Sequence, residues 1–311
     1  MKKILVIGSS NTDMIIKVKQ FPAPGETVLG GKFLMAAGGK GANQAVAAAR
    51  AGGEVNFIAC LGNDAFAKQA LLNYVEDKIN IDNIIIDKKN PSGVALILVS
   101  AEGENSIAVA SGANAELTSE LIQQKHNVIK NADILLLQLE TPLETVIKAA
   151  EIAHAEGVTV ILNPAPVQSL PKNLWSNIDF LTPNTAEAEQ LSGIKITDLE
   201  SAKKTAHVIL DLGVRHVIIT LGDQGALLAD RSQQILIPSF IVNTVDTTAA
   251  GDTFNGALAV ALSDNMPLID AVKFANAAAA LSVTKNGAQP SIPRREEILQ
   301  FLQSEKRNEV A

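Results

Sequence analysis

Short apolar runs alternate with longer amphipathic stretches along most of the chain. The runs have the length and composition of strands buried in a parallel sheet, and they cover residues 4–7, 55–59, 134–137, 158–162 and 217–220. The stretches between them have helical periodicity and include 65–77, 119–129, 143–154 and 201–212, with Gly157 and Gly213 placed where helices end. This alternation predicts an α/β fold, a mostly parallel sheet with helices on both faces.

Several candidate site residues stand directly after strand-like runs. Asn11, Glu140, Asn163, Asn184 and Gly222 each follow such a run. Open parallel sheets bind their ligands outside the C-terminal ends of the strands. We therefore expect these five residues to lie along one edge of the sheet.

Two segments break the alternation. Residues 14–35 and 92–109 are strand-like, contain turn sequences at 22–25 and 102–105, and have no helical stretch inside them. They predict two hairpin insertions that form a small antiparallel sheet. Such an open sheet needs a partner for one of its faces.

Composition narrows the class of protein. The 26 basic and 33 acidic residues give a net charge of −7, which argues against a nucleic-acid or anionic-membrane partner. The single cysteine, Cys60, excludes an internal disulfide and ends an apolar run, so we expect it in the core. The four histidines lack metal-ligand spacing. No apolar run is long enough for a membrane span or a signal-peptide core, so we expect a cytoplasmic protein.

The stretch 245–256 carries the strongest chemical signal. A β-branched, strand-like segment leads into Ala249, Ala250 and Gly251, then Asp252, then an apolar helical pattern. Small residues at a helix start let successive N–H groups converge on an anion or a developing negative charge. Asp252 beside such an anion hole suits a general base that deprotonates a hydroxyl. The alternative is an aspartate that simply complements the helix dipole.

A second glycine-rich stretch lies at residues 37–44, before an alanine-rich helical run. Its glycines permit close backbone approach and positive φ angles. Asn43 offers both a donor and an acceptor, which suits a polyol. Gln44 occupies the sixth position, where the dinucleotide fingerprint requires a small residue, and no Gly-Lys-Ser/Thr sequence occurs for a Walker A loop.

Together, the two stretches resemble the paired signatures of the ribokinase-like (PfkB) family of carbohydrate kinases. Further landmarks of that family match in order over essentially the whole chain, at residues 8–13, 138–142, 163–166, 182–187, 220–225 and 285–291. The resemblance implies one α/β domain over residues 1–311. It also implies that the two insertions form a lid over the sugar, which is commonly the contact in a homodimer.

The activity implied by this resemblance is transfer of the γ-phosphate of ATP to the 5-hydroxyl of D-ribose. Asp252 then takes the hydroxyl proton, and the N–H groups of Ala249, Ala250, Gly251 and Asp252 stabilise the moving phosphoryl group. The family more often has glycine where this chain has Ala249.

The resemblance also implies the ligand contacts. The sugar contacts carried over are Asn11, Asp13, Gly39, Lys40, Asn43, Glu140 and Asp252. The ATP contacts are Asn184, Thr220, Gly222, Gly225, Gly251 and Asn276, the last of these in the final long helix.

Two ions follow from the same resemblance. Glu187 matches the residue that holds Mg²⁺, through water. Asp246, which we expect on a strand that leads to the anion hole, belongs to a set of oxygen ligands for an activating K⁺. The set consists of Asp246, Ser291 and the carbonyls of Thr248, Ser282, Lys285 and Gly287.

Other functions stay open. Deoxyribose differs from ribose by one hydroxyl, so a kinase for that sugar is the nearest alternative. A sugar-phosphate kinase would need more cations than Lys17, Lys19, Lys32 and Lys40, and a nucleoside kinase would need more aromatic residues in the lid than Phe21 and Phe33. The intact Gly251, Asp252 and Glu187 argue against an inactive sugar-binding regulator.

Overall fold

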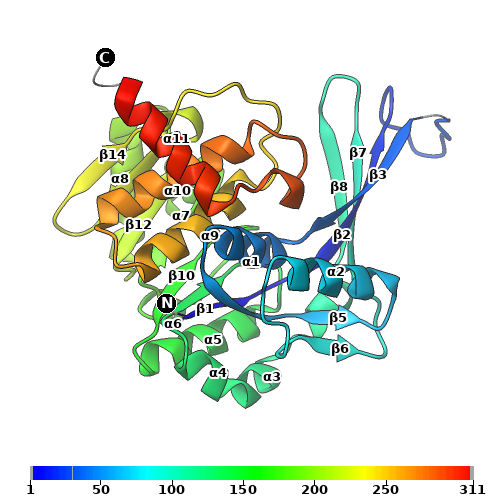
Figure 1. Cartoon of the computed structure of the whole chain (residues 1–311), viewed down its shortest axis with the longest axis horizontal. Coiled ribbons are helices and arrows are strands. Elements are labelled where there is room, and N and C mark those ends of the chain that lie inside the picture. The colour runs from blue at the N-terminus through cyan, green and yellow to red at the C-terminus, as the bar shows by residue number, and fades with distance from the viewer. Residues whose placement is uncertain (1–2, 30, 309–311) are drawn as a thin grey trace.

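The computed structural model of this protein describes residues 3–29 and 31–308 (Figure 1). Position 30 of the first predicted insertion, and positions 1, 2 and 309–311 of the predicted domain, lie outside the described residues. Within the described ranges, the main sheet has eight strands in the order β14-β13-β12-β11-β10-β9-β1-β4. Their bounds are β1 Lys3–Ile7, β4 Glu54–Ile58, β9 Ile134–Leu137, β10 Thr159–Leu162, β11 Phe180–Leu181, β12 His216–Thr220, β13 Ala226–Ala229 and β14 Gln234–Ile237.

The mostly parallel sheet predicted from the apolar runs is confirmed. The pairs from β4 to β12 are parallel, and the edge hairpin formed by β13 and β14 is antiparallel. The short strand β11 and this edge hairpin were not predicted. Cys60 is buried, as expected, and burial raises the pKa of its thiol to about 11. In the described residues, no helix has the length and apolar character that crossing a membrane requires.

Helices cover both faces of the sheet. The helices are α1 Lys40–Arg50, α2 Ala65–Glu76, α3 Ser119–Gln124, α4 His126–Lys130, α5 Leu143–Ala155, α6 Lys172–Trp175, α7 Thr185–Ser192, α8 Leu199–Asp211, α9 Ala250–Ser263, α10 Leu268–Ser282 and α11 Arg295–Asn308. Ile4 and Val6 pack into the cluster formed with α1, α2, α9, α10 and α11. Leu5 and Ile7 point to the opposite face and pack with helices between α3 and α8. Because both faces are covered, the strands are apolar throughout rather than alternating.

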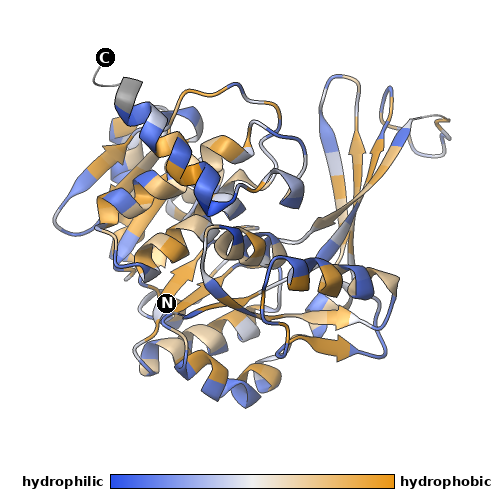
Figure 2. Cartoon of the chain, in the orientation of Figure 1, coloured by the Kyte–Doolittle hydropathy of each residue, from blue (hydrophilic) through white to orange (hydrophobic). Residues whose placement is uncertain are grey.

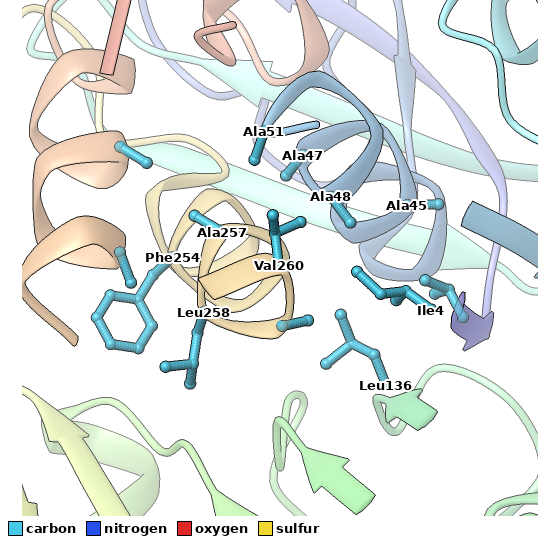
Figure 3. Packing of buried hydrophobic residues seen from close by; sticks show 14 of the residues in the cluster. Ile4, Ala45, Ala47, Ala48, Ala51, Leu136, Phe254, Ala257, Leu258 and Val260 are labelled. Atoms are coloured by element: carbon cyan, nitrogen blue, oxygen red, sulfur yellow. The ribbon is translucent and has the colours of Figure 1, made fainter. Parts of the chain in front are cut away.

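Helices α1 and α9 pack tightly against each other. Figure 3 shows Ala47 and Ala48 of α1 next to Ala257 and Val260 of α9. A Cβ atom at Gly256 would lie 2.5 Å from the Cβ of Ala47 and 2.7 Å from the carbonyl oxygen of Gln44. The two helices can approach so closely only because their contact residues are small.

Three local predictions were wrong. The helix expected over 119–129 is divided at Lys125, whose N–H donates to Ile122 three residues back and so tightens the turn. No strand leads to the anion hole, because the N–H groups of Val245 and Asp246 donate to the carbonyl of Val283 after α10 rather than to a sheet. Asn276 lies in α10, which is followed by the final helix, α11.

A second sheet projects from the body of the molecule (Figure 1). It has the order β3-β2-β7-β8, with bounds β2 Asn11–Lys17, β3 Lys32–Gly38, β7 Gly93–Val99 and β8 Asn105–Ala110. The two predicted hairpins are present, but the pair β2–β7 is parallel, so the sheet is mixed rather than antiparallel. Both central strands leave the body from the same end, where Asn11 is opposite Gly93, and this common origin makes them parallel. We call this sheet the lid.

The lid strands have an apolar face that no other part of the described chain covers. Figure 2 shows hydrophobic residues along these strands, away from the body. Phe33, Met35 and Leu96 are each more than half exposed. Register places Met35 and Leu96 beside Met14, and Phe33 beside Ile16, on a single face of the sheet.

We predict that Gly256→Val destabilises the protein by about 1–3 kcal/mol, because the added side chain overlaps α1. Urea unfolding monitored by circular dichroism measures this change. The matched control is Ala155→Val, which adds a β-branched side chain at an exposed helical position and should change stability by less than about 0.5 kcal/mol. Equal stability of the two variants would contradict the tight contact between α1 and α9.

Candidate active site

Three cavities lie where the predicted site residues meet. The first, of about 200 Å³, is lined by Lys40, Asn184, Glu187 and the start of α9 from Ala249 to Asp252. The second, of about 570 Å³, is lined by Thr220, Gly222, Gly225 and Asn276, and it shares Ala250 and Gly251 with the first. The third, of about 410 Å³, is lined by Asn11, Glu140 and Val109 of the lid.

Asp252 lies at the centre of this arrangement, in the first turn of α9. It is buried, and each carboxylate oxygen accepts a hydrogen bond from a side-chain amide of α1. Asn43 Nδ2 donates to Oδ2 and Gln44 Nε2 donates to Oδ1, both over 2.9 Å. Burial raises the pKa of Asp252, opposed by the charge of Lys40 and by the two amides. A buried carboxylate with fitted donors has a more specific role than complementing the helix dipole at a solvated surface.

The start of α9 is open towards the first two cavities. Ala249 has φ +60°, the left-handed conformation that glycine adopts at least cost, in agreement with the glycine that the family more often has there. A Cβ atom at Gly251 would meet nothing within 4 Å. The backbone of the first helical turn is therefore accessible to an anion in the cavity.

Several predicted sugar contacts lie near Asp252. They come from the start of strand β2 and from the glycine-rich loop before α1. Burial, together with the nearby carboxylates of Glu140 and Asp252, raises the pKa of Asp13 to about 6. Glu140 accepts hydrogen bonds from Ser9 Oγ at 2.6 Å and from the N–H of Lys40 at 2.9 Å. Gly39 has φ +87°, and a Cβ atom there would lie 2.7 Å from the backbone nitrogen of Asn11.

The amide of Asn11 has one defined orientation. Asn114, which follows strand β8 of the lid, donates from Nδ2 to Asn11 Oδ1 over 2.8 Å. Asn114 also accepts from the N–H of Ser10 over 2.9 Å. This hydrogen bond orients the amide of Asn11, so that its Nδ2 is available as a donor to a ligand besides the second lone pair of its Oδ1.

Lys40 is a half-buried cation among carboxylates. Burial lowers its pKa, but Asp252, Glu140 and Glu187 outweigh burial, so the pKa of Lys40 lies above its ordinary value. Since Lys40 lines the first cavity together with Glu187, it lies between the predicted sugar contacts and the predicted ATP contacts.

The predicted ATP and Mg²⁺ residues form the start of α7 and the wall of the second cavity. Asn184 and Glu187 make a capping box, in which Asn184 donates to both carboxylate oxygens of Glu187 over 2.9 Å. Burial raises the pKa of Glu187 against these hydrogen bonds. Asn276 Nδ2 donates to the carbonyls of Ile237 and Pro238, over 3.1 and 3.2 Å, and so joins α10 to the end of β14.

The two loops predicted to hold K⁺ lie side by side. Asp246 accepts from the N–H and Oγ1 of Thr248, over 2.9 and 2.6 Å, and from the N–H of Gly287 over 2.8 Å. Burial opposes ionisation of Asp246, but these hydrogen bonds outweigh it and hold its pKa below its ordinary value. Ser282 and Ser291, which stand before and after Gly287 in the sequence, are fully buried. The side chain of Lys285 forms an ion pair with Glu297. The ion assignment itself stays a prediction.

Several residues of this site had no predicted role. Asn114, Asn163 and Thr182 line the cavities themselves, whereas Ser9, Gln44 and Gln138 lie behind the lining and belong to the same hydrogen-bond networks. Gln44, Gln138, Asn163 and Thr182 stand inside the quoted motifs, so their position next to predicted ligands was the available signal. Asn114 stands outside every motif, and only the tertiary structure shows its contact with Asn11.

Comparison with known proteins agrees with this arrangement. Residues 1–295 match the pfkB family carbohydrate kinase model. The chain belongs to this family. It is similar to the ribokinase of Haemophilus influenzae, with 47% identity over 302 residues that cover 97% of this chain and 99% of that protein. A deoxyribokinase of Salmonella typhimurium is 38% identical over 300 residues, covering 96% and 98% of the two chains.

The fold also matches a solved structure of the same family. The structure of Arabidopsis thaliana ribokinase complexed with ribose and ATP has a TM-score of 0.91 and 32% identity, and it covers 97% of this chain and 98% of that one. The predicted α/β fold with a small separate sheet is therefore confirmed as the fold of these kinases.

We predict that Asp13→Asn stabilises the ligand-free protein at pH 7.5 by about 1–3 kcal/mol. The folded-state pKa of Asp13, about 6, is above the ordinary value of 3.8, so its contribution to stability is present below pH 3.8 and is lost as the pH rises through 6. The neutral amide removes this loss. Urea unfolding of both proteins should show a smaller difference in unfolding free energy at pH 4.5 than at pH 7.5. A difference that does not depend on pH would contradict the raised pKa of Asp13.

Proposed function

We propose that this protein is an ATP-dependent kinase that transfers the γ-phosphate to the 5-hydroxyl of D-ribose. The observation that carries the proposal is the position of Asp252, a buried carboxylate at the N-terminus of α9. There it lines the first cavity, which Lys40 also lines, and it lies close to Asp13, a predicted sugar contact. Similarity to ribokinases over nearly the whole length supports ribose as the acceptor.

The reaction follows from this geometry. The 5-hydroxyl oxygen attacks the γ-phosphorus, Asp252 takes the hydroxyl proton, and ADP leaves with the electrons of the broken phosphoanhydride bond. The raised pKa makes the Asp252 carboxylate a stronger proton acceptor than an ordinary aspartate. The N–H groups of Ala249, Gly251 and Asp252 are placed to stabilise the charge that develops on the phosphoryl group, whereas that of Ala250 joins them only by giving up its 3.2 Å hydrogen bond to the carbonyl of Thr247. Asn11, Asp13, Gly39, Lys40, Asn43 and Glu140 hold the sugar.

We infer that Mg²⁺ is the cofactor and that Glu187 holds it through water. Glu187 lines the first cavity, and each of its oxygens has an unused lone pair besides the one that accepts from Asn184. Such an oxygen donor fits a hydrated Mg²⁺, which would neutralise charge on the ATP phosphates when bound. ATP extends from there across Asn184, Gly251, Thr220, Gly222, Gly225 and Asn276.

We propose that K⁺ binds between the loop of Asp246 and residues 282–291. The hydrogen bond from Gly287 to Asp246 brings the two loops into contact, and the proposed ligands are all oxygen atoms. They are Asp246, Ser291 and the carbonyls of Thr248, Ser282, Lys285 and Gly287. A cation there would act through the backbone that leads to Ala249.

We further propose that the protein is a cytoplasmic homodimer in which each chain is one domain. The exposed face of the lid that contains Phe33, Met35 and Leu96 supports a contact between two lids, because apolar faces of open sheets need a partner.

We predict that the parent protein forms ADP from MgATP and ribose, and that Asp252→Asn lowers this turnover by about 10²–10⁴-fold without loss of ATP binding. The carboxamide keeps the shape of the side chain but cannot take a proton. A coupled ADP assay over ribose, deoxyribose, hexoses and nucleosides measures activity, and calorimetry measures ATP binding. A higher kcat/KM for deoxyribose than for ribose would identify deoxyribose as the phosphoryl acceptor. Ribose binding without ADP formation would show that the protein is an inactive sugar-binding regulator.

We predict that K⁺ activates the parent protein when KCl replaces tetramethylammonium chloride at equal ionic strength. Asp246→Ala should lose most of this response, because displacement of the site backbone by ~1 Å costs about 10²-fold in rate. Initial rates during a K⁺ titration provide the measurement. Asp230→Ala is the matched control, since Asp230 caps a similar turn through Ser232 outside the two loops. A flat titration of the parent would show that K⁺ does not activate.

A further inference from the structure

Gln44 is a fully buried glutamine that contacts Asp252 but lines none of the three cavities described above. Its Nε2 donates to Asp252 Oδ1 over 2.9 Å and to Asn163 Oδ1 over 3.1 Å. Its Oε1 accepts from Gln138 Nε2 over 2.6 Å. Both ends of this amide therefore have fitted partners, and Asp252 is one of them.

The direction of these hydrogen bonds follows from the charge of Asp252. An ionised carboxylate only accepts hydrogen bonds, so Gln44 must present its NH₂ group to Asp252 and its oxygen to Gln138. Gln138 must in turn present its own NH₂ group to Gln44. Asn163 donates to the carbonyl of Thr182 over 3.0 Å, which leaves its oxygen as the acceptor for Gln44.

Space for this chain of amides depends on a glycine. A Cβ atom at Gly8 would overlap the amide of Gln138 and approach Gly41 Cα to 2.7 Å. Among the described residues, no group donates to Gln138 Oε1, although the atom is buried.

We propose that Gln44, oriented by Gln138, is a positioning residue for the general base Asp252. Its hydrogen bond engages Oδ1, the oxygen opposite the one that Asn43 contacts, and fixes the rotation of the carboxylate. Asn43 is a predicted sugar contact, so Oδ2 is the oxygen on the sugar side and the one that takes the proton. This inference rests on the proposed function of Asp252.

Gln44 also holds the ionised form of Asp252 in a site rich in negative charge. The charged groups that face Asp252 are Lys40 and the carboxylates of Asp13, Glu140 and Glu187. Three carboxylates and burial favour the protonated acid, whereas Lys40, Asn43 and Gln44 favour the carboxylate. Loss of the donor from Gln44 should thus raise the pH at which the base becomes active.

The experiment compares Gln44→Met, which removes the donor, with Gln44→Glu, which places a second carboxyl against Asp252. The acidic limb of kcat/KM for ribose should move up by about one to two pH units in Gln44→Met, the equivalent of one charge-assisted hydrogen bond. It should move further in Gln44→Glu, where two carboxyl groups share a proton. At the pH optimum, kcat should fall while KM for ribose stays near the parent value.

A second measurement does not depend on turnover. The ¹³C NMR titration of labelled aspartate carboxyl groups, with Asp252→Asn used for assignment, reports the pKa of Asp252 directly. An upward shift in Gln44→Met supports the inference even if another sugar is the substrate. If the parent lacks activity with every sugar, the proposed function fails, and this titration alone decides whether Gln44 controls the carboxylate.

Controls separate positioning from packing. Ile209→Val removes one buried methyl group in α8, which carries none of the site residues, and should leave the acidic limb and the Asp252 titration unchanged. Gln138→Met should shift the acidic limb and the Asp252 titration in the same direction as Gln44→Met, but by less. If the Gln44 variants do not fold, the Gln138→Met result decides the outcome. A lower melting temperature with an unchanged titration would overturn the inference and leave Gln44 a packing residue.

Discussion

The site depends on the close approach of α1 and α9. Gly256 and Ala47 leave no room for larger side chains between the two helices. This contact brings the amides of Asn43 and Gln44 within hydrogen-bonding distance of Asp252 on the first turn of α9. With wider spacing, water would solvate Asp252, and its carboxylate would lose both its orientation and its perturbed pKa.

Several charged side chains lie close together near this contact and are partly or fully removed from water. Glu187 and Asp252 line the first cavity together with Lys40, and burial, with the nearby charges of Glu140 and Asp252, raises the pKa of Asp13 to about 6. Such crowding lowers the stability of the ligand-free protein, as active sites often do. In the proposed function, the hydroxyl donors of a sugar would supply partners that these carboxylates lack in the free chain.

The lid connects sugar contacts to an apolar surface. Strand β2 begins at Asn11 and contains Asp13, while Asn114 after β8 holds the amide of Asn11 in place. The same strands continue outward to the uncovered face of Phe33, Met35 and Leu96. Movement or pairing of the lid would therefore act directly on the residues predicted to hold the sugar.

The sequence by itself determined the main sheet and the positions of the candidate site residues. Strands covered on both faces must be apolar throughout, and a phosphate site at a helix start needs small residues, so both features appear as local patterns at β1, β9 and Ala249–Asp252. Only the tertiary structure decided contacts between distant segments. The parallel pairing of β2 with β7, and the attachment of Val245 to α10 instead of a strand, depend on packing that no local pattern records. Gln44 and Asp252 are 208 positions apart, and a glutamine gains its role only from the group that its amide meets.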